Sequence, residues 1–233
     1  YQPPLNDTDA FDADDGELQG DRLLSGTYTI GIEAYRSFEV EEESVRDAAN
    51  ATKDFLFGDA TELAPREVVT QANCNQCHNE LRAHGDIRRD VTHCLLCHTA
   101  GAEDRNPADV ANGTPGRSID FKIMIHKLHN AAHLPSVNGV TLDSNGEVQY
   151  PTSQQEQDNR SEPYEIIGFG DRVHDFSEVA FPAWPNLTQP MPLDRGTSSL
   201  NDFGQEVSET ISAGLTDCSK CHGRIPKASM KDG

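Results

Sequence analysis

A two-residue alternation of apolar and polar side chains runs through Thr27–Tyr35 and predicts a β-strand there. Its apolar members share one face: Tyr28, Ile30, Ile32 and Ala34. Two shorter segments, Asp54–Phe57 and Glu67–Thr70, are further strand candidates, and the acidic run Glu41–Glu43 is typical of a solvated edge. We therefore expect a small β-rich subdomain over residues 26–70.

A second periodicity, close to 3.6 residues, predicts a helix over Ile119–Leu134. Its apolar stripe consists of Phe121, Met124, Ile125, Leu128 and Ala132. Pro115 lies just before the helix and Pro135 ends it. Further along, the pair Asn145–Gly146 between two short apolar runs predicts a hairpin turn.

Composition limits the classes of function. The 233 residues include 39 Asp and Glu against 19 Lys and Arg, and the resulting net charge of −20 disfavours binding to nucleic acid or to an anionic membrane surface. No apolar run is long enough to span a membrane as a helix. Residues 1–25 form an acidic tail, and a chain that starts at Tyr1 without an apolar leader predicts a mature, exported form. Several prolines around Trp184 favour extended chain there.

All six cysteines fall in three copies of one pattern, Cys-x-x-Cys-His, which is the attachment signature of c-type haem. The two thiols bond to the two vinyl groups of one porphyrin, and the following imidazole ligates its iron. We therefore predict three haems c. The attachment residues are Cys74, Cys77, Cys94, Cys97, Cys218 and Cys221, and the proximal ligands are His78, His98 and His222.

Cys-x-x-Cys pairs also build zinc sites and thioredoxin-like redox motifs. Three copies that use every cysteine, each followed by histidine, favour haem over both alternatives. Haem faces are large apolar surfaces that replace part of an ordinary core, which fits a chain with only 35% hydrophobic residues. The predicted fold is a small N-terminal β-rich subdomain followed by a loop-rich, mainly α haem-wrapping domain over residues 71–233, as in multihaem cytochromes c.

Six histidines remain that could close the second axial position of each iron: His84, His93, His126, His129, His133 and His174. Three of them, His126, His129 and His133, share one strip of the predicted helix and could reach two neighbouring irons, although a zinc-like cluster or a solvated edge would give the same pattern. Gly85 allows the chain after His84 to turn sharply past a porphyrin. The predicted distal ligands are His84, His126 and His129, and the reserve candidates are His174, His133 and His93.

Irons that carry two imidazoles have no position for a substrate, so we predict an electron carrier rather than an enzyme. The first hypothesis is extracellular electron transfer by a chain that polymerises head to tail into a haem-lined filament. The alternative is a soluble periplasmic or surface shuttle that does not polymerise, and a multihaem oxyanion or metal reductase comes third. The expected partners are other copies of the chain, redox partner cytochromes and extracellular electron acceptors.

Several segments resemble the outer-surface multihaem cytochromes of metal-reducing bacteria, the OmcA/MtrC family. They are Ser25–Ala34, Cys74–Gly85 with Arg88, Cys94–His98, Ile119–His129 and Asp175–Pro182. The resemblance runs from about Ser25 to His222. It implies extracellular electron transfer, with His84, His126 and His129 as distal ligands, by a three-haem variant of that family.

Overall fold

The computed structural model describes residues 23–65, 69–104, 114, 116–168, 172–181, 199–213 and 218–223. The acidic tail up to residue 22 and the chain around Trp184 lie outside this description. The chain divides into two compact units, Tyr1–Leu96 and Cys97–Gly233, and each is described by itself. The division falls inside the second Cys-x-x-Cys-His motif.

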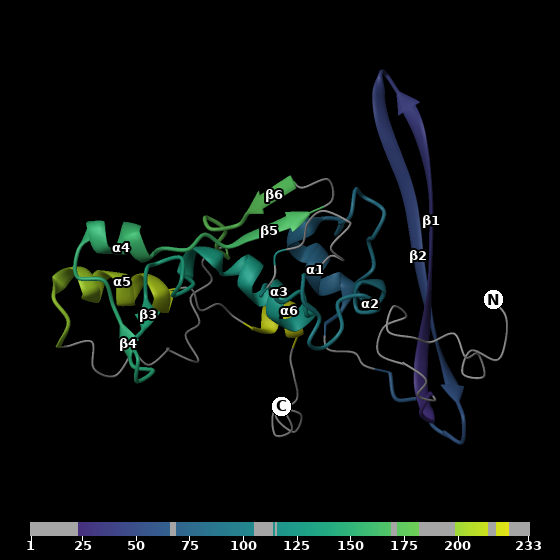
Figure 1. Cartoon of the computed structure of the whole chain (residues 1–233). Helices are drawn as coiled ribbons and strands as arrows, with labels where there is room; N and C mark the ends of the chain where they lie inside the picture. Colours follow the sequence, from purple (N-terminus) through teal and green to yellow (C-terminus); the bar gives the residue numbers. More distant parts are fainter. Residues whose placement is uncertain are drawn as a thin grey trace. The chain divides into compact units, whose positions relative to one another are not determined.

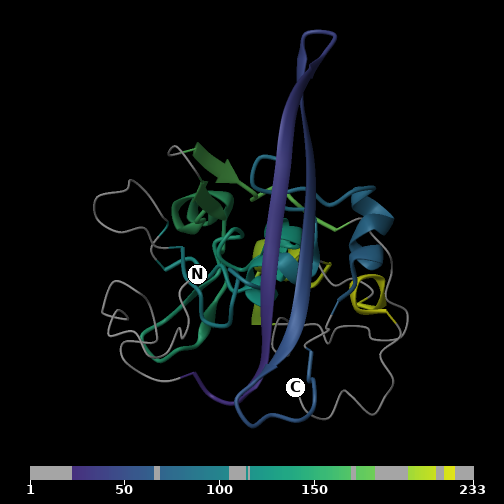
Figure 2. The same cartoon turned by 90° about the vertical axis from the view of Figure 1, so that its right-hand side faces the viewer.

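The first unit is built on a long two-stranded antiparallel ribbon, in which β1 (Gly26–Val40) pairs with β2 (Glu43–Phe57) (Figure 1). Glu41 and Glu42 make the connecting turn with φ values of 50° and 71°. Both residues therefore have a left-handed backbone conformation, as a tight two-residue hairpin turn requires. In Figure 1 and Figure 2 the turn end of the ribbon projects past the other elements of this unit.

The strand predicted over Thr27–Tyr35 is confirmed, but both strands are longer than their apolar patterns. Asp54–Phe57 is only the end of a 15-residue strand. Polar residues interrupt β2, so its own alternation is hidden, and the strand is fixed by its pairing with β1, in the register that sets Ile32 opposite Ala51. Of the strand predicted over Glu67–Thr70, only residues 69 and 70 are described, and neither lies in a strand.

One face of the ribbon packs on segment 82–96 of the same unit. The Asn50 amide donates a hydrogen bond to the carbonyl of Ile87 over 3.1 Å. The approach is closest at Gly31, where a Cβ atom would lie 2.3 Å from Cδ1 of Leu96. Glycine therefore allows the backbone of β1 to touch the segment that carries the second motif.

The second unit consists mainly of short helices and loops. Its helices are α3 (Phe121–His129), α4 (Gln154–Arg160), α5 (Asp202–Ala213) and α6 (Ser219–His222), with a 3₁₀ turn η2 (Ala131–His133). Its two small hairpins are β3 (Thr141–Leu142) with β4 (Val148–Gln149), and β5 (Glu165–Gly168) with β6 (Arg172–Asp175). The hairpin predicted at Asn145–Gly146 is β3–β4. The predicted order, a β-rich start followed by helices and loops, is confirmed.

The helix predicted over Ile119–Leu134 is shorter than its apolar stripe. The Asp120 carboxylate accepts a hydrogen bond from the backbone N–H of Lys122 (2.9 Å) and caps the first turn. At Asn130 the backbone leaves the helical region with φ −120° and ψ 19°. The chain continues as η2, in which Ala131 is fully buried, so tertiary packing rather than periodicity decides where α3 ends.

Apolar burial is sparse in the part of the chain that the structure describes. Val91, Ala131, Tyr164 and Val207 are its only buried hydrophobic side chains. A chain of this size ordinarily buries a much larger apolar core. Sparse burial of this kind fits an interior that large apolar cofactors complete.

Candidate haem sites

The first Cys-x-x-Cys-His motif lies on α1 (Gln71–His78). The Thr70 side chain caps this helix by accepting a hydrogen bond from the backbone N–H of Asn73. Cys74 and Cys77 are three residues apart on the helix and therefore share one face. Two sulfurs on a single face are the arrangement that attachment to one porphyrin edge requires.

The side-chain amide of Gln71 connects α1 to the second motif. It donates to the carbonyl of Arg89 (2.7 Å) and accepts from the backbone N–H of Val91 (3.0 Å). Val91 is the first residue of α2 (Val91–Cys94), which the Asp90 carboxylate caps. The first motif and the start of the second are thus tied together within one unit.

Predicted distal ligand His84 lies in a loop that a bridge between Ala83 and Arg88 closes. His84, Gly85 and Asp86 have φ values of 51°, 67° and 68°. Left-handed backbone is unfavourable for the two non-glycine residues, and it persists only where surrounding contacts enforce it. The guanidinium group of Arg46 on β2 donates a hydrogen bond to the carbonyl of Gly85. The ribbon therefore helps to hold the loop that contains the exposed His84.

The environment of Cys94 disfavours the thioredoxin-like alternative. Burial raises the pKa of the Cys94 thiol, and the nearby Asp90 carboxylate raises it further. A redox-active pair needs the opposite, a thiolate stabilised by a lowered pKa. As for metal sites, no three His, Cys, Asp or Glu side chains gather to hold a bare ion among the described residues.

His93, a reserve candidate, contacts a carboxylate. Its side chain is 9% exposed, and its Nε2 lies 3.2 Å from Oε2 of Glu33 on β1. Nε of Arg88 lies 3.0 Å from the same oxygen. The buried Nδ1 of His93 has no hydrogen-bond partner. The Nε2 atom therefore faces Glu33, and this cluster joins the ribbon to the second motif.

We expect Glu33→Gln to reduce the loss of unfolding free energy that occurs as the pH falls. The hydrogen bond from Arg88, with a smaller contribution from His93, holds the pKa of Glu33 below its ordinary value of 4.5. A carboxylate with a lowered pKa stabilises the fold above the pKa of the unfolded chain, and this stability is lost as the pH falls through the lower folded value. Unfolding by denaturant between about pH 6 and about pH 3 measures the slope. Glu39→Gln, on the same strand outside the cluster, is the control, and equal slopes in the two variants would contradict the ion pair.

Four histidines of the second unit each have their Nδ1 atom against a backbone carbonyl. The Nδ1 atoms of His98, His126, His129 and His133 lie against the carbonyls of Ile119 (2.7 Å), Lys122, Ile125 (2.8 Å) and Thr210 (2.7 Å), respectively. A carbonyl oxygen only accepts, so Nδ1 carries the hydrogen and Nε2 carries the lone pair. This tautomer, fixed by a backbone carbonyl, is the one in which metal-bound histidines are commonly held.

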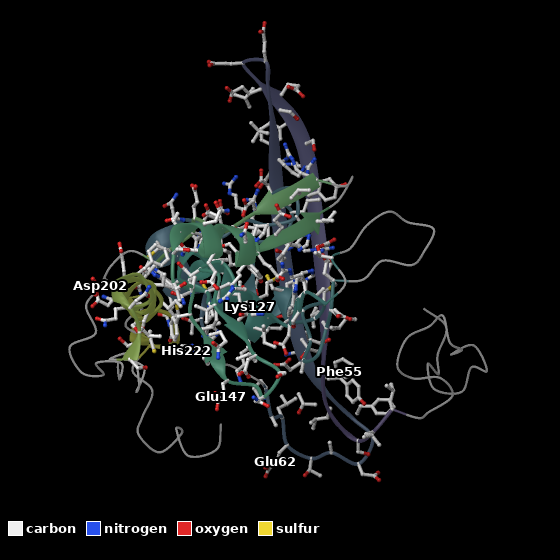
Figure 3. All side chains as sticks on the ribbon, turned by 60° about the vertical axis from the view of Figure 1, so that its left-hand side comes forward. Phe55, Glu62, Lys127, Glu147, Asp202 and His222 are labelled. Atoms are coloured by element: carbon white, nitrogen blue, oxygen red, sulfur yellow. The ribbon has the colours of Figure 1, made fainter. Side chains whose placement is uncertain are left out.

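The imidazole rings of His126 and His222 are neighbours in the second unit. Their ring centroids are 6.0 Å apart and their planes differ by 16°. Two metal–nitrogen bonds of about 2 Å, each with about 1 Å more to the ring centre, give a spacing of about 6 Å between two imidazoles on one ion. Figure 1 shows α3 and α6 side by side, and Figure 3 labels His222 on α6. The spacing of the two rings is therefore the one expected for two imidazoles on one iron at the third motif.

Helix α3 also contacts the second motif. The Nδ1–H group of His98 donates to Ile119 just before the helix, and the backbone N–H of Phe121 donates to the carbonyl of His98 (3.2 Å). The Phe121 ring lies 6.4 Å from the His98 ring. One nine-residue helix thus contacts both His98 of the second motif and His222 of the third.

The remaining candidates have different surroundings. His129 lies 4.8 Å from the ring of Phe181, with planes 17° apart. His133 is bound at Nδ1 by α5, and the exposed His174 lies on β6, 6.3 Å from the ring of Phe176. Sequence reasoning missed Phe181 as a neighbour of His129 and all four carbonyl partners, because every residue carries a carbonyl and none is marked in a sequence.

Comparison with known families identifies the class of protein. The model of the family described as outer membrane cytochrome MtrC/MtrF-like, domains II/IV, matches residues 66–232. The chain belongs to this family of outer membrane cytochromes, and membership implies haem c and electron transfer. The expected family is thereby confirmed.

One solved structure is similar to the chain, the crystal structure of the outer membrane decahaem cytochrome OmcA. It is 25% identical over 85% of this chain, with a TM-score of 0.42. The chain spans 25% of the length of that protein. No curated protein matches the chain. In the part that the structure describes, none of the helices has the length and hydropathy of a membrane span.

Proposed function

We propose that the chain is an electron-transfer protein that holds three haems c, each with an imidazole on both sides of its iron. The observation that carries the proposal is the His126–His222 pair, whose 6.0 Å spacing suits one shared iron. All six cysteines belong to attachment motifs, which gives three sites for three haems. The haem, when bound, supplies one-electron iron chemistry.

In this proposal the histidines have two roles. His78, His98 and His222 are the proximal ligands that follow the attachment cysteines. His126 is the distal partner of His222, and His84 and His129 close the irons of the first two motifs. The backbone carbonyls against His98, His126 and His129 hold each ring in the orientation that presents Nε2.

The connections between motifs favour transfer from one haem to the next. Gln71 ties α1 to the beginning of α2 by two hydrogen bonds. On helix α3, Phe121 contacts His98 and His126 pairs with His222, and these two positions are about 7.5 Å apart along the helix. The second and third motifs therefore contact one short helix, about one and a half turns apart.

We place this activity outside the cell, in line with the outer membrane cytochrome family, and propose that copies assemble head to tail into a haem-lined filament. A single chain with three haems spans only a short distance, and repetition extends the path. The acceptors are then extracellular oxidants or redox partner cytochromes. A shuttle with the same haems and no polymer is the competing outcome.

Three measurements on the native holoprotein test the proposal. Intact mass spectrometry gives the polypeptide mass plus three haems, and the oxidised spectrum contains only low-spin iron. Negative-stain electron microscopy gives filaments. The bare polypeptide mass overturns the haem assignment, a high-spin iron in the native protein overturns the closed axial positions in favour of a reductase, and dispersed particles at all concentrations replace the filament with the shuttle.

A further inference from the structure

The ribbon of the first unit has one face that none of the described segments of this unit covers. Residues of even number from 30 to 40 on β1 and of odd number from 43 to 53 on β2 share this face, because opposite partners in an antiparallel pair point to the same side. We call it the outer face. The other face, with Gly31 and Asn50, contacts segment 82–96. On the outer face Ile30 is 56% exposed and Ile32 is 66% exposed.

Exposed apolar side chains in a row are unusual on a two-stranded ribbon, which is marginally stable in water without further packing. Figure 3 shows the side chains that project from the ribbon, with Phe55 labelled near the end opposite the turn. Phe38 and Val40 form a second apolar group at the turn end of the same face, beyond Arg36, at 40% and 46% exposure. Two exposed apolar groups on one face of such a ribbon indicate a partner.

We propose that a second copy of this chain covers the outer face, with the two ribbons stacked face to face and antiparallel about a twofold axis. An axis that lies between the ribbons and perpendicular to the strands sets β1 over β1 and β2 over β2 with reversed direction. Each pair of opposite residues on one ribbon then meets a different pair on the other. The order of the pairs along the ribbon decides whether this contact fits.

The charges at the two ends of the outer face are complementary in this arrangement. Ile30 is opposite Lys53 at the far end of the ribbon, and Val40 is opposite Glu43 at the turn end. Reversal sets Ile30 over Val40 of the second copy and Lys53 over Glu43 of the second copy. The twofold axis repeats both contacts, so the dimer gains two opposite-charge contacts and two apolar contacts.

The sizes of the side chains also match. The Ile32–Ala51 pair meets the Phe38–Val45 pair of the second copy, so a small Ala51 faces a larger Val45. Stacked sheets keep interiors close-packed when large and small side chains alternate across the contact. Apolar side chains then lie opposite one another over this part of the face.

Small side chains also face large ones in the middle of the outer face. The Ala34–Ala49 pair lies next to the Arg36–Asp47 pair, whose ion pair measures 2.9 Å. In the antiparallel stack the two alanines face the ion pair of the second copy and leave room for its longer side chains. A parallel stack would set alanine pairs over each other, leave a gap, and bring like charges to the same end. The antiparallel order is therefore the one that fits.

This contact goes beyond the proposed electron-transfer function and does not depend on it. A twofold contact uses the same patch on both copies and closes after two, whereas a head-to-tail polymer needs two different patches. The two assemblies are therefore separable by experiment. A paired protein without filaments contradicts only the polymer, and filaments without ribbon pairing contradict only the twofold contact.

Charge exchange tests the pairing directly in the haem-loaded chain. Light scattering and sedimentation over a concentration series give the dimer dissociation constant. We expect Lys53→Glu and Glu43→Lys each to weaken pairing about tenfold, because each replaces two attractive contacts with repulsive ones. The double variant Lys53→Glu/Glu43→Lys restores pairing to within about threefold of the native value. Failure of the double variant to restore it overturns the antiparallel order.

A second pair of variants tests the apolar part of the face. Ile32→Asp should weaken pairing more than about a hundredfold. Leu142→Asp is the matched control, because Leu142 on β3 is 67% exposed, nearly the same as Ile32, and lies outside the ribbon. Haem absorbance per chain, unchanged in all variants, shows that the fold is retained. A native chain that stays monomeric at hundreds of micromolar, or equal effects of the two aspartates, overturns the proposal.

Discussion

Replacing His126 with alanine will convert about one-third of the haem in the oxidised protein from low spin to high spin. The proposed iron at the third motif lies between His126 and His222, whose rings are 6.0 Å apart. Loss of one imidazole leaves that iron with a weak or absent sixth ligand, while the other two haems keep both of theirs. Electron paramagnetic resonance and the absorption spectrum measure the fraction.

Two controls isolate the ligand effect. Alanine at the exposed His174 on β6 should leave every haem low-spin, because that ring lies beside Phe176 rather than a proximal histidine. Added imidazole should return the His126→Ala protein to low spin by filling the space that the side chain vacated. Retention of full low-spin signal in His126→Ala would contradict the assignment of His126 to the third motif, even with three haems attached.

The chemistry of this protein is easier to predict from sequence than its geometry. Three Cys-x-x-Cys-His motifs predict the attachment sites because the spacing itself is the chemical requirement. The helix with His126 and His129 follows from its apolar period, although the period does not say that the chain leaves the helix at Asn130. A single sequence contains no record of which imidazole faces which iron.

What sequence did not reveal depends on contacts between distant segments. His133 is oriented by the carbonyl of Thr210, 77 residues away, and any residue at that place offers the same acceptor. The strand β2 is hidden because its polar residues break the alternation, and only pairing with β1 defines it. The boundary of the two units at Leu96 lies inside a haem motif, where composition gives no sign of a division.

Substitution of Gly31 by valine will destabilise the first unit by about 2–3 kcal/mol, the upper part of the range for overpacked sites. A Cβ atom at this position would lie 2.3 Å from Cδ1 of Leu96 and 2.9 Å from Nδ1 of His93. Both contacts are closer than van der Waals distance, and the buried His93 has little space to move. Denaturant unfolding of the oxidised holoprotein, followed by circular dichroism, measures the loss.

Gly26→Val is the matched control, because no atom lies within 4 Å of the corresponding Cβ and the residue is in the same strand. Valine suits a strand, so this variant should be as stable as the native chain or slightly more stable. Truncating the neighbour, in Gly31→Val/Leu96→Ala, should recover part of the loss by opening the space that the new side chain needs, and a double-mutant cycle gives the coupling energy. Equal stability of Gly31→Val and Gly26→Val would mean that β1 does not rest on the second haem motif. The contact matters for function because Leu96 lies between Cys94 and Cys97, so a ribbon displaced at Gly31 also loosens the peptide to which the second haem is proposed to be attached.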